Sequence, residues 1–140
     1  RIMCSGSPAT IDVFNPNHNT PDFNYIDDIL EGVIRTLDRV PGPDPAFDPS
    51  APTPASSRAP YRVYNIGSHR PIQLSRYIDV LEQCLGRSAQ RNLLPLQPGD
   101  VPDTYADVEE LVRDTGYAPA TPVEVGVARF VEWYRGFYGT

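Results

Sequence analysis

The sequence predicts an α/β fold, because short β-rich segments alternate with segments of helical periodicity along its 140 residues. Residues 11–15, 61–66 and 91–96 are rich in β-branched, aromatic and leucine side chains. Between and after them, apolar side chains recur at three- and four-residue spacing, which is typical of amphipathic helices.

The first strand, loop and helix are predicted over residues 11–39, with the helix ending near Arg39. The alternating strand is followed by a loop rich in Asn and Pro, and helical spacing begins at Tyr25. One face of this helix must be buried, and it consists of Ile26, Ile29, Leu30, Val33 and Leu37. Asp27 and Asp28 lie in the first turn, where carboxylates suit the positive end of the helix dipole. We expect a site where the strand gives way to the helix, but no catalytic carboxylate pair, because adjacent helical residues point about 100° apart.

Residues 40–60 are predicted to form an exposed, Pro-rich insertion loop. Pro, Ala, Ser and Asp dominate this stretch, and it has no apolar periodicity. Such a composition buries too little apolar surface to offset the entropy of ordering the chain. We therefore interpret residues 1–140 as a single unit that contains this loop.

The segment after the loop predicts a strand, a helix and a second strand. Tyr61–Ile66 is almost continuously apolar, which is typical of a strand buried on both faces of a parallel sheet. Helical spacing continues over residues 73–85, with Gly86 at the usual C-cap position. Residues 91–96 form the next strand, which ends at Gln97-Pro-Gly-Asp100, where the Pro-Gly pair is typical of a type II turn.

Two capping boxes predict the last two helices. Asp107 with Glu110 begins a short helix, and Thr121 with Glu124 begins the final one. The final helix has an apolar face that must dock on something apolar, formed by Val123, Val127, Phe130, Tyr134 and Phe137, with Trp133 alongside.

Composition excludes several classes of function. The net charge is −6 without a basic cluster, so a nucleic-acid backbone would be repelled. No apolar run approaches the roughly 20 residues that span a bilayer. Cys4 and Cys84 lack Cys-x-x-Cys spacing, which favours reduced cytoplasmic thiols. His18 and His69 have no second ligand at metal spacing, so a metal site is not expected. The sequence also has no Gly-x-Ser-x-Gly elbow, so a Ser-His-Asp nucleophile is not expected.

A resemblance to a known family begins at Asp22-Phe-Asn-Tyr-Ile-Asp-Asp-Ile-Leu-Glu-Gly32. This stretch resembles the Arg-Asp-Phe-Thr-Tyr-Ile-Asp-Asp-Ile signature in the C-terminal part of UDP-glucuronate 4-epimerases. Those enzymes belong to the extended short-chain dehydrogenase/reductase superfamily. The similarity continues in the family's order through Val63–Gly67, Leu94–Pro102, Thr104–Asp107 and Phe130–Arg135. Several ordered motifs are far more specific than any one of them.

The resemblance implies the C-terminal portion of an extended Rossmann-type epimerase, comprising the last strand and helix of the large sheet and the small substrate-binding lobe. The parent enzyme would transfer hydride at sugar C4 with NAD. Neither the Gly-rich dinucleotide turn nor the Tyr-x-x-x-Lys pair occurs here, and the chain has no Lys at all. No catalytic or cofactor-binding residue is therefore expected, and NAD falls to an N-terminal domain that is absent from this sequence. The start at Arg1 indicates a cut end, and the expected partners are that domain, a UDP-sugar and a second parent subunit in a homodimer.

The candidate substrate-binding residues are Gln97, Asp100, Asp22 and Arg70. Gln97 and Asp100 belong to a turn that resembles the family's loop near the nucleotide diphosphate, where related epimerases have Arg in place of Gln97. An ordinary surface turn is the alternative interpretation, and a solvated side chain is the alternative for Arg70. The family signature begins with Arg, whereas this chain has Pro21, which offers neither a charge nor a backbone N–H to a diphosphate.

Two main hypotheses remain at this point. The first is the substrate-binding part of a nucleotide-sugar 4-epimerase, of the UDP-glucuronate/UDP-galacturonate type. The second is a truncated or degenerate homologue that acts as a non-catalytic binding or assembly module. A helix pair exchanged between subunits ranks third. Under the first hypothesis the isolated chain exposes apolar faces and is poorly soluble or loosely packed.

Overall fold

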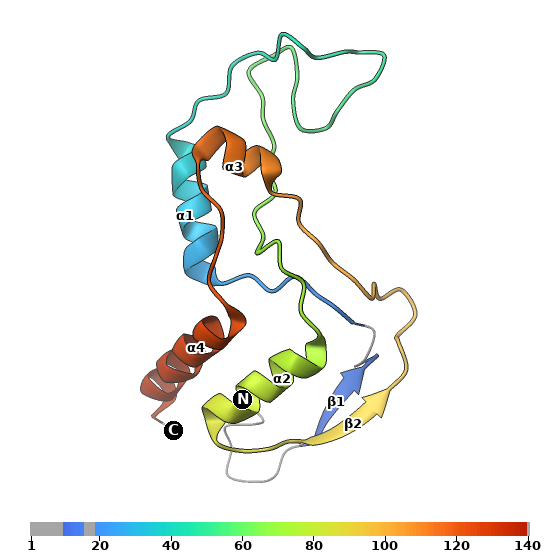
Figure 1. Cartoon of the computed structure of the whole chain (residues 1–140), viewed down its shortest axis with the longest axis vertical. Coiled ribbons are helices and arrows are strands. Elements are labelled where there is room, and N and C mark those ends of the chain that lie inside the picture. Colours follow the sequence, from blue (N-terminus) through green and yellow to red (C-terminus); the bar gives the residue numbers. More distant parts are fainter. Residues whose placement is uncertain (1–9, 16–18, 140) are drawn as a thin grey trace.

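The computed structural model describes residues 10–15 and 19–139, and it is an α/β chain of two strands and four helices in this part (Figure 1). The elements are β1 (Thr10–Phe14), α1 (Ile26–Leu37), α2 (Leu74–Leu85), β2 (Gln90–Leu94), α3 (Glu109–Thr115) and α4 (Val123–Tyr138). The predicted fold class is confirmed. None of the helices in these ranges has the length and apolar content to cross a bilayer. Expectations for Cys4 and His18 lie outside the described residues.

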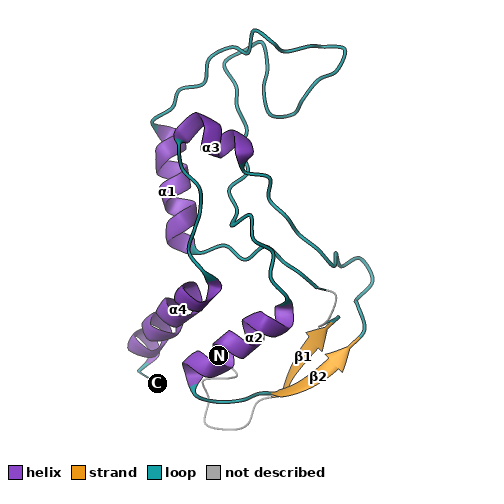
Figure 2. Ribbon diagram, in the orientation of Figure 1, coloured by secondary structure: helices purple, strands orange, loops and turns teal. Residues whose placement is uncertain are grey.

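The two strands form a parallel pair beside α2 (Figure 2). Thr10 lies opposite Gln90 and Phe14 opposite Leu94, with Val13 almost fully buried in between. Arg91 fixes this pair to α2, since its guanidinium bonds the carboxylates of Asp79 at 2.6 Å and Glu82 at 2.8 Å. The predicted strand at residues 91–96 is present, but it begins one residue earlier, at Gln90, and ends two residues earlier, at Leu94.

The main apolar core lies between α2 and α4. It contains Val80 and Leu85 from α2 and Val127 and Val131 from α4. Gly86 ends α2 in the left-handed conformation, with φ of 67°, as its position in the sequence predicts. The predicted face of α4 is only partly correct, because Phe130, Trp133 and Phe137 are exposed and Val131 is buried instead.

A smaller contact joins α1 to α3. Gly32 of α1 lies against Ile66, where an added Cβ would come within 3.0 Å of the isoleucine side chain. Leu111 of α3 is completely buried. The rest of this chain does not bury the apolar face of α1, because four of its five residues are 48–79% exposed: Ile26, Leu30, Val33 and Leu37.

Residues 61–66 do not form the predicted strand. Tyr61 and Val63 are exposed, and the regular ladder expected of a buried strand is replaced by an isolated antiparallel bridge between Ser56 and Arg62. A strand is stable only beside a neighbour that pairs with it. Within the described residues, Val63 donates instead to the Ala55 carbonyl at 3.0 Å, back in the Pro-rich loop.

The predicted capping boxes also differ from the structure. Asp107 accepts a hydrogen bond from the Glu109 N–H at 3.0 Å, but it is not the predicted N-cap, because α3 begins at Glu109 and its N-cap residue is Val108. Thr121 likewise does not cap α4, because its hydroxyl donates to Asp28 of α1 at 2.8 Å and the N-cap residue is Pro122. The side chain of Thr121 thus joins two elements that are distant in sequence.

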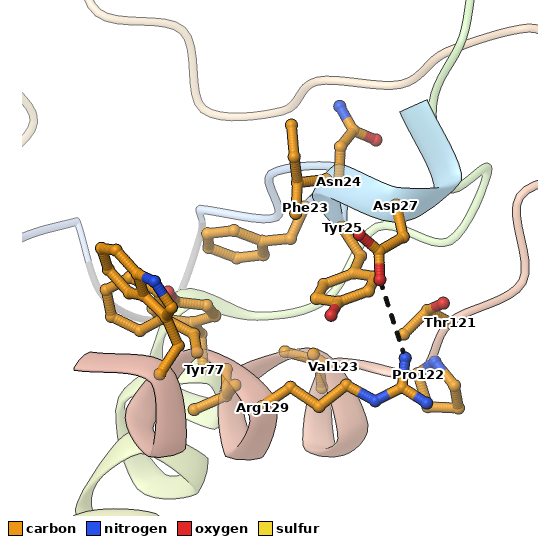
Figure 3. Close-up of a pocket in the computed structure, with 14 residues that line it drawn as sticks. Phe23, Asn24, Tyr25, Asp27, Tyr77, Thr121, Pro122, Val123 and Arg129 are labelled. Carbon is orange, nitrogen blue, oxygen red and sulfur yellow. Dashed lines mark ion pairs between the residues drawn. The ribbon is translucent and has the colours of Figure 1, made fainter. Parts of the chain in front are cut away.

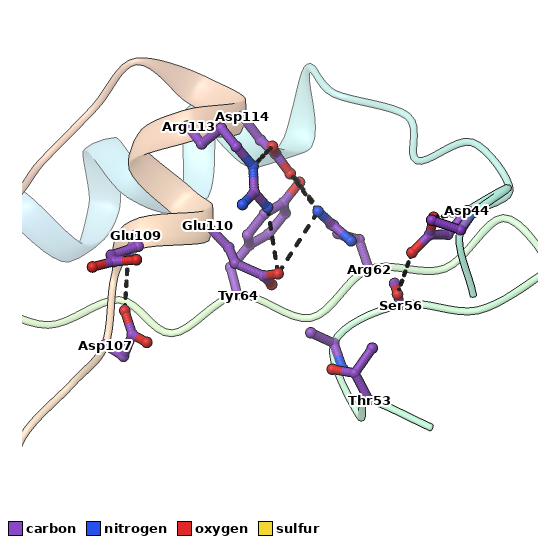
Figure 4. Close-up of polar contacts among 12 residues, drawn as sticks. Asp44, Thr53, Ser56, Arg62, Tyr64, Asp107, Glu109, Glu110, Arg113 and Asp114 are labelled. Atoms are coloured by element: carbon purple, nitrogen blue, oxygen red, sulfur yellow. Dashed lines mark hydrogen bonds and ion pairs between the residues drawn. The ribbon is translucent and has the colours of Figure 1, made fainter. Parts of the chain in front are cut away.

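Polar contacts link α3 to the segment that directly follows the Pro-rich loop (Figure 4). Residues 40–60 contain turns but no helix or strand, and Ser56 donates to Asp44 at 2.6 Å within the loop. At its end, Arg62 and Tyr64 both donate to Asp114, at 3.2 and 2.9 Å. Burial alone would raise the pKa of Asp114, but donors that include Tyr64, Arg113 and Arg62 outweigh it and hold that pKa below its ordinary value.

Candidate functional site

The candidate site is built around residues 19–27, which connect β1 to α1. The start of this segment, residues 19–21, runs between two other segments of the chain. On one side, the N–H groups of Ile72 and Leu74 donate to the carbonyls of Pro21 and Asn19, at 3.2 and 3.0 Å. On the other, the Thr20 N–H donates to the Pro102 carbonyl at 2.9 Å, and Thr20 pairs with Asp103 in a parallel bridge.

Asp22 is the point at which these three segments are joined. One carboxylate oxygen accepts hydrogen bonds from the N–H groups of His69 and Ala106, both at 3.2 Å, and the other accepts the Ser68 hydroxyl. The Asp22 N–H itself donates to the Thr104 hydroxyl at 2.9 Å. All of these partners are protein groups, so the carboxylate of this predicted substrate-binding residue is engaged inside the chain.

The other three predicted site residues are exposed. Gln97 and Asp100 share a tight turn, in which the Asp100 N–H donates to the Gln97 carbonyl at 3.1 Å and Gly99 has φ of 86°, as the Pro-Gly pair predicts. Arg70 follows the Asp22 contacts, and its N–H donates to the Ser68 hydroxyl at 3.2 Å. Within the described residues, no hydrogen bond or ion pair joins Arg70 to the turn.

A cavity of about 570 Å³ opens on the other side of this segment, between the start of α1, α2 and α4 (Figure 3). The rings of Phe23 and Tyr77 stack at 4.1 Å with only 10° between their planes. Burial raises the pKa of Tyr77, which keeps its phenol neutral. At the rim, Arg129 lies 4.0 Å from Asp27 and covers the Tyr25 ring at 5.6 Å.

None of the four predicted site residues lines this cavity. The sequence did predict a site where strand gives way to helix, and residues 23–27 do border the cavity. Sequence reasoning missed Tyr77 and Arg129, because they come from helices 50 and 100 residues downstream. The available signal was the polar Arg129 next to the otherwise apolar face of the last helix.

The side chains at this site are suited to binding. The cavity offers aromatic faces, an amide from Asn24 and one ion pair at the rim. His69 is held on both sides: its Nδ1 lies 3.1 Å from the Ala106 carbonyl and its Nε2 lies 2.8 Å from the Tyr105 hydroxyl. Because a carbonyl only accepts, Nδ1 donates to Ala106, while Nε2 and the Tyr105 hydroxyl share the second hydrogen bond. Among the described residues, no cluster of three His, Cys, Asp or Glu side chains lies close enough to hold a metal ion.

Comparison with known proteins relates this chain to a family of longer proteins. A 37.6 kDa protein of Escherichia coli O111:H- is 50% identical over 129 residues, which are 92% of this chain and 39% of that protein. A probable UDP-glucuronate 4-epimerase of Rhizobium meliloti is 42% identical over 129 residues. The chain is homologous to the C-terminal part of UDP-glucuronate 4-epimerases.

The chain spans less than two fifths of the length of these relatives, 39% and 38%. None of the protein-family models searched matches the chain. The structure of a UDP-glucuronic acid 4-epimerase from Bacillus cereus, in complex with UDP-glucuronic acid and NAD, aligns with 99% of this chain at a TM-score of 0.71. This chain covers 39% of that structure, and at 23% identity the alignment shows the fold alone, which is that of a C-terminal portion of an extended Rossmann-type protein, as expected from the sequence.

Proposed function

We propose that this chain is the substrate-binding part of an NAD-dependent nucleotide-sugar 4-epimerase of the UDP-glucuronate/UDP-galacturonate type. The observation that carries the proposal is the 42% identity to a probable UDP-glucuronate 4-epimerase along 91% of the chain. The implied reaction oxidises sugar C4, turns the keto intermediate and returns the hydride to the other face. The contribution of this chain is to hold the UDP-sugar.

We propose that this chain does not itself bind NAD. The chain has no Gly-rich dinucleotide turn and no Lys for a Tyr-x-x-x-Lys pair. Its residues therefore do not fit the cofactor, and we assign NAD to the N-terminal domain of a longer parent protein. The isolated chain is accordingly proposed to be inactive.

The exposed apolar faces support an N-terminal domain as the partner. Leu30, Val33 and Leu37 of α1 are 48–79% exposed, and Phe130 and Trp133 of α4 are 50% and 55% exposed. Apolar surface of this extent is characteristic of contact surfaces. We propose that the parent's NAD-binding domain covers them and that the parent is a homodimer.

Cys84 carries a free thiol, which is consistent with the reducing cytoplasm as its compartment.

One observation favours a second function, that of a non-catalytic binding or assembly module. Pro21 occupies the position where the family signature has Arg, and its carbonyl is bonded to the Ile72 N–H at 3.2 Å. A proline there supplies no charge-assisted hydrogen bond to a diphosphate. A degenerate homologue would keep this fold and lose the nucleotide.

Calorimetric titration of the chain with UDP separates the two functions, with uridine as the matched ligand that lacks both phosphates. A substrate-binding part should bind UDP measurably more tightly than uridine. Equal and negligible heats from both ligands would contradict nucleotide binding by this chain and favour the binding or assembly module.

A further inference from the structure

We propose that Asp22 is a positioning residue that sets the geometry of the two loops carrying the candidate UDP contacts. The inference rests on the proposed function and extends it, because it assigns Asp22 a role other than direct ligand contact. The carboxylate would act through the backbone of other residues. The two loops are residues 67–70, which end at Arg70, and residues 95–106, which contain the Gln97–Asp100 turn.

The first connection runs from Asp22 to Arg70 in two steps. The Ser68 hydroxyl donates to one Asp22 oxygen and accepts the Arg70 N–H at 3.2 Å. Between them, the His69 N–H donates to the other Asp22 oxygen, and His69 adopts a left-handed conformation with φ of 56°. A non-glycine residue in that conformation needs surrounding contacts to hold it. Asp22 thus fixes the path of the backbone that leads to Arg70.

The second connection reaches the loop that contains the turn. Asp22 accepts the Ala106 N–H, and its own N–H donates to the Thr104 hydroxyl. These bonds hold the far end of the loop, while β2 holds its near end. Asp22 and Ala106, which are 84 positions apart in the sequence, are therefore joined directly by a hydrogen bond. Both candidate contact regions take their position from the same carboxylate.

Close packing makes this junction specific. Gly67 is buried, and an added Cβ there would lie 2.3 Å from the Ala106 side chain and 3.0 Å from an Asp22 oxygen. The Ser68 N–H also donates to the Asn24 side chain at 2.9 Å. The junction is therefore closely packed where Gly67 meets Ala106 and Asp22.

Asp28 provides a matched control. Its carboxylate also accepts three hydrogen bonds, from the N–H groups of Ala120 and Thr121 and from the Thr121 hydroxyl. It joins α1 to the segment before α4, and none of those partners belongs to the two loops. Asp22→Ala and Asp28→Ala thus each remove a carboxylate that accepts three hydrogen bonds. Only the Asp22 carboxylate is connected to the loops that contain Arg70 and the turn.

The experiment measures UDP affinity by calorimetry and backbone amide hydrogen exchange by NMR for Asp22→Ala, Asp22→Asn, Ser68→Ala and Asp28→Ala. We expect Asp22→Ala to weaken UDP binding about tenfold or more, and Asp28→Ala to change it less than twofold. Asp22→Asn should recover most of the affinity, because its carbonyl oxygen can still accept from His69 and Ala106. Ser68→Ala should speed exchange of the Arg70 amide about tenfold, as expected for one lost hydrogen bond.

Two results would overturn the proposal: equal loss of UDP affinity in the Asp22 and Asp28 variants, or an Arg70 amide that exchanges at the wild-type rate in Ser68→Ala. If Asp22→Ala does not fold, Ser68→Ala carries the test, because it leaves the His69 and Ala106 bonds in place. If the wild-type chain does not bind UDP, the proposed function fails for this chain. The exchange rates then decide independently whether Asp22 holds the loops.

Discussion

At the scale of single residues, close packing at Gly67 and the substitution at Pro21 have the most direct consequences. Pro21 directly precedes Asp22, and Gly67 begins one of the loops that Asp22 joins. Gly67 is required by space, since its neighbours leave no volume for a side chain. Pro21 is acceptable to the fold, since it contributes only its carbonyl, to Ile72. We therefore expect Gly67 to affect the stability of the fold and Pro21 to affect ligand binding.

Gly67→Ala should destabilise the chain, because the new methyl group would lie 2.3 Å from the Ala106 side chain. Forcing an extra methyl group into a packed site costs about 1–3 kcal/mol. Gly136→Ala is the matched control: no atom lies within 4 Å of its added Cβ, and it sits inside α4. That variant should gain roughly 0.5–1 kcal/mol from helix propensity. Urea unfolding measures both, and equal free energies of unfolding for the two variants would contradict the packing argument.

Pro21→Arg should increase UDP affinity if the proposed substrate site is retained. A charge-assisted hydrogen bond to a phosphate contributes about 1.5–3 kcal/mol, which corresponds to roughly 10- to 150-fold in the dissociation constant. The same titration with uridine serves as the control and should change little. An unchanged UDP dissociation constant would place the diphosphate away from residue 21.

At the scale of elements, the link between β2 and α2 depends on a partly buried ionic cluster. Glu82 accepts from the Arg91 guanidinium at 2.8 Å and from the Ala89 N–H at 3.0 Å, and its side chain is only 16% exposed. The bond from Arg91 is the largest cause that holds the pKa of Glu82 below the ordinary value of 4.5. Arg91 also pairs with Asp79 of α2 at 2.6 Å, so this one arginine of β2 is held by two carboxylates of the same helix.

This cluster predicts a pH dependence of stability. Because the pKa of Glu82 is lower in the folded state, its contribution is fully present above the unfolded value near 4.5 and is lost as pH falls through the folded value. Glu82→Gln should remove about 1.5–3 kcal/mol at pH 7 and much less at pH 3. Urea unfolding at both pH values measures it. Glu124→Gln, which breaks an ion pair whose side chains are 49% and 50% exposed, is the control and should change little.

At the scale of the whole molecule, the core is small and much apolar surface remains in contact with water. The α2–α4 contact and the α1–α3 contact are separate, and large apolar side chains of α1 and α4 stay exposed. An isolated chain with this distribution should bind hydrophobic dyes and associate at high concentration. Cooperative unfolding with little dye binding would contradict this expectation.

A charged substitution on the exposed α1 face separates surface exposure from core packing. Leu37→Glu replaces a side chain that is 79% exposed, so it should lower dye binding without loss of stability. Leu111→Ala empties a fully buried position in α3 and should cost about 2–5 kcal/mol. Dye fluorescence and urea unfolding of both variants measure the difference. If dye binding stays unchanged in Leu37→Glu, the surface that binds the dye lies elsewhere.

The sequence alone predicted the features that depend on nearby residues. Helical spacing predicted α1, α2 and α4, Gly86 predicted the end of α2, and Pro98-Gly99 predicted the turn. These are local properties, because periodicity and backbone preference act within a few residues. The ordered motifs also indicated the family, since their residues can be compared without knowledge of the contacts they make.

Only the tertiary structure decided which partners these residues find. Asp22 was expected to contact substrate, but its carboxylate is engaged by groups that lie 46 to 84 residues away. Thr121 was expected to cap α4 and instead bonds Asp28, which is 93 residues away. Residues 61–66 have the composition of a strand, yet a strand also needs a neighbour, and composition does not supply one. A hydrogen bond depends on the positions of both groups, and for such distant pairs those positions are set by the packing of the whole chain.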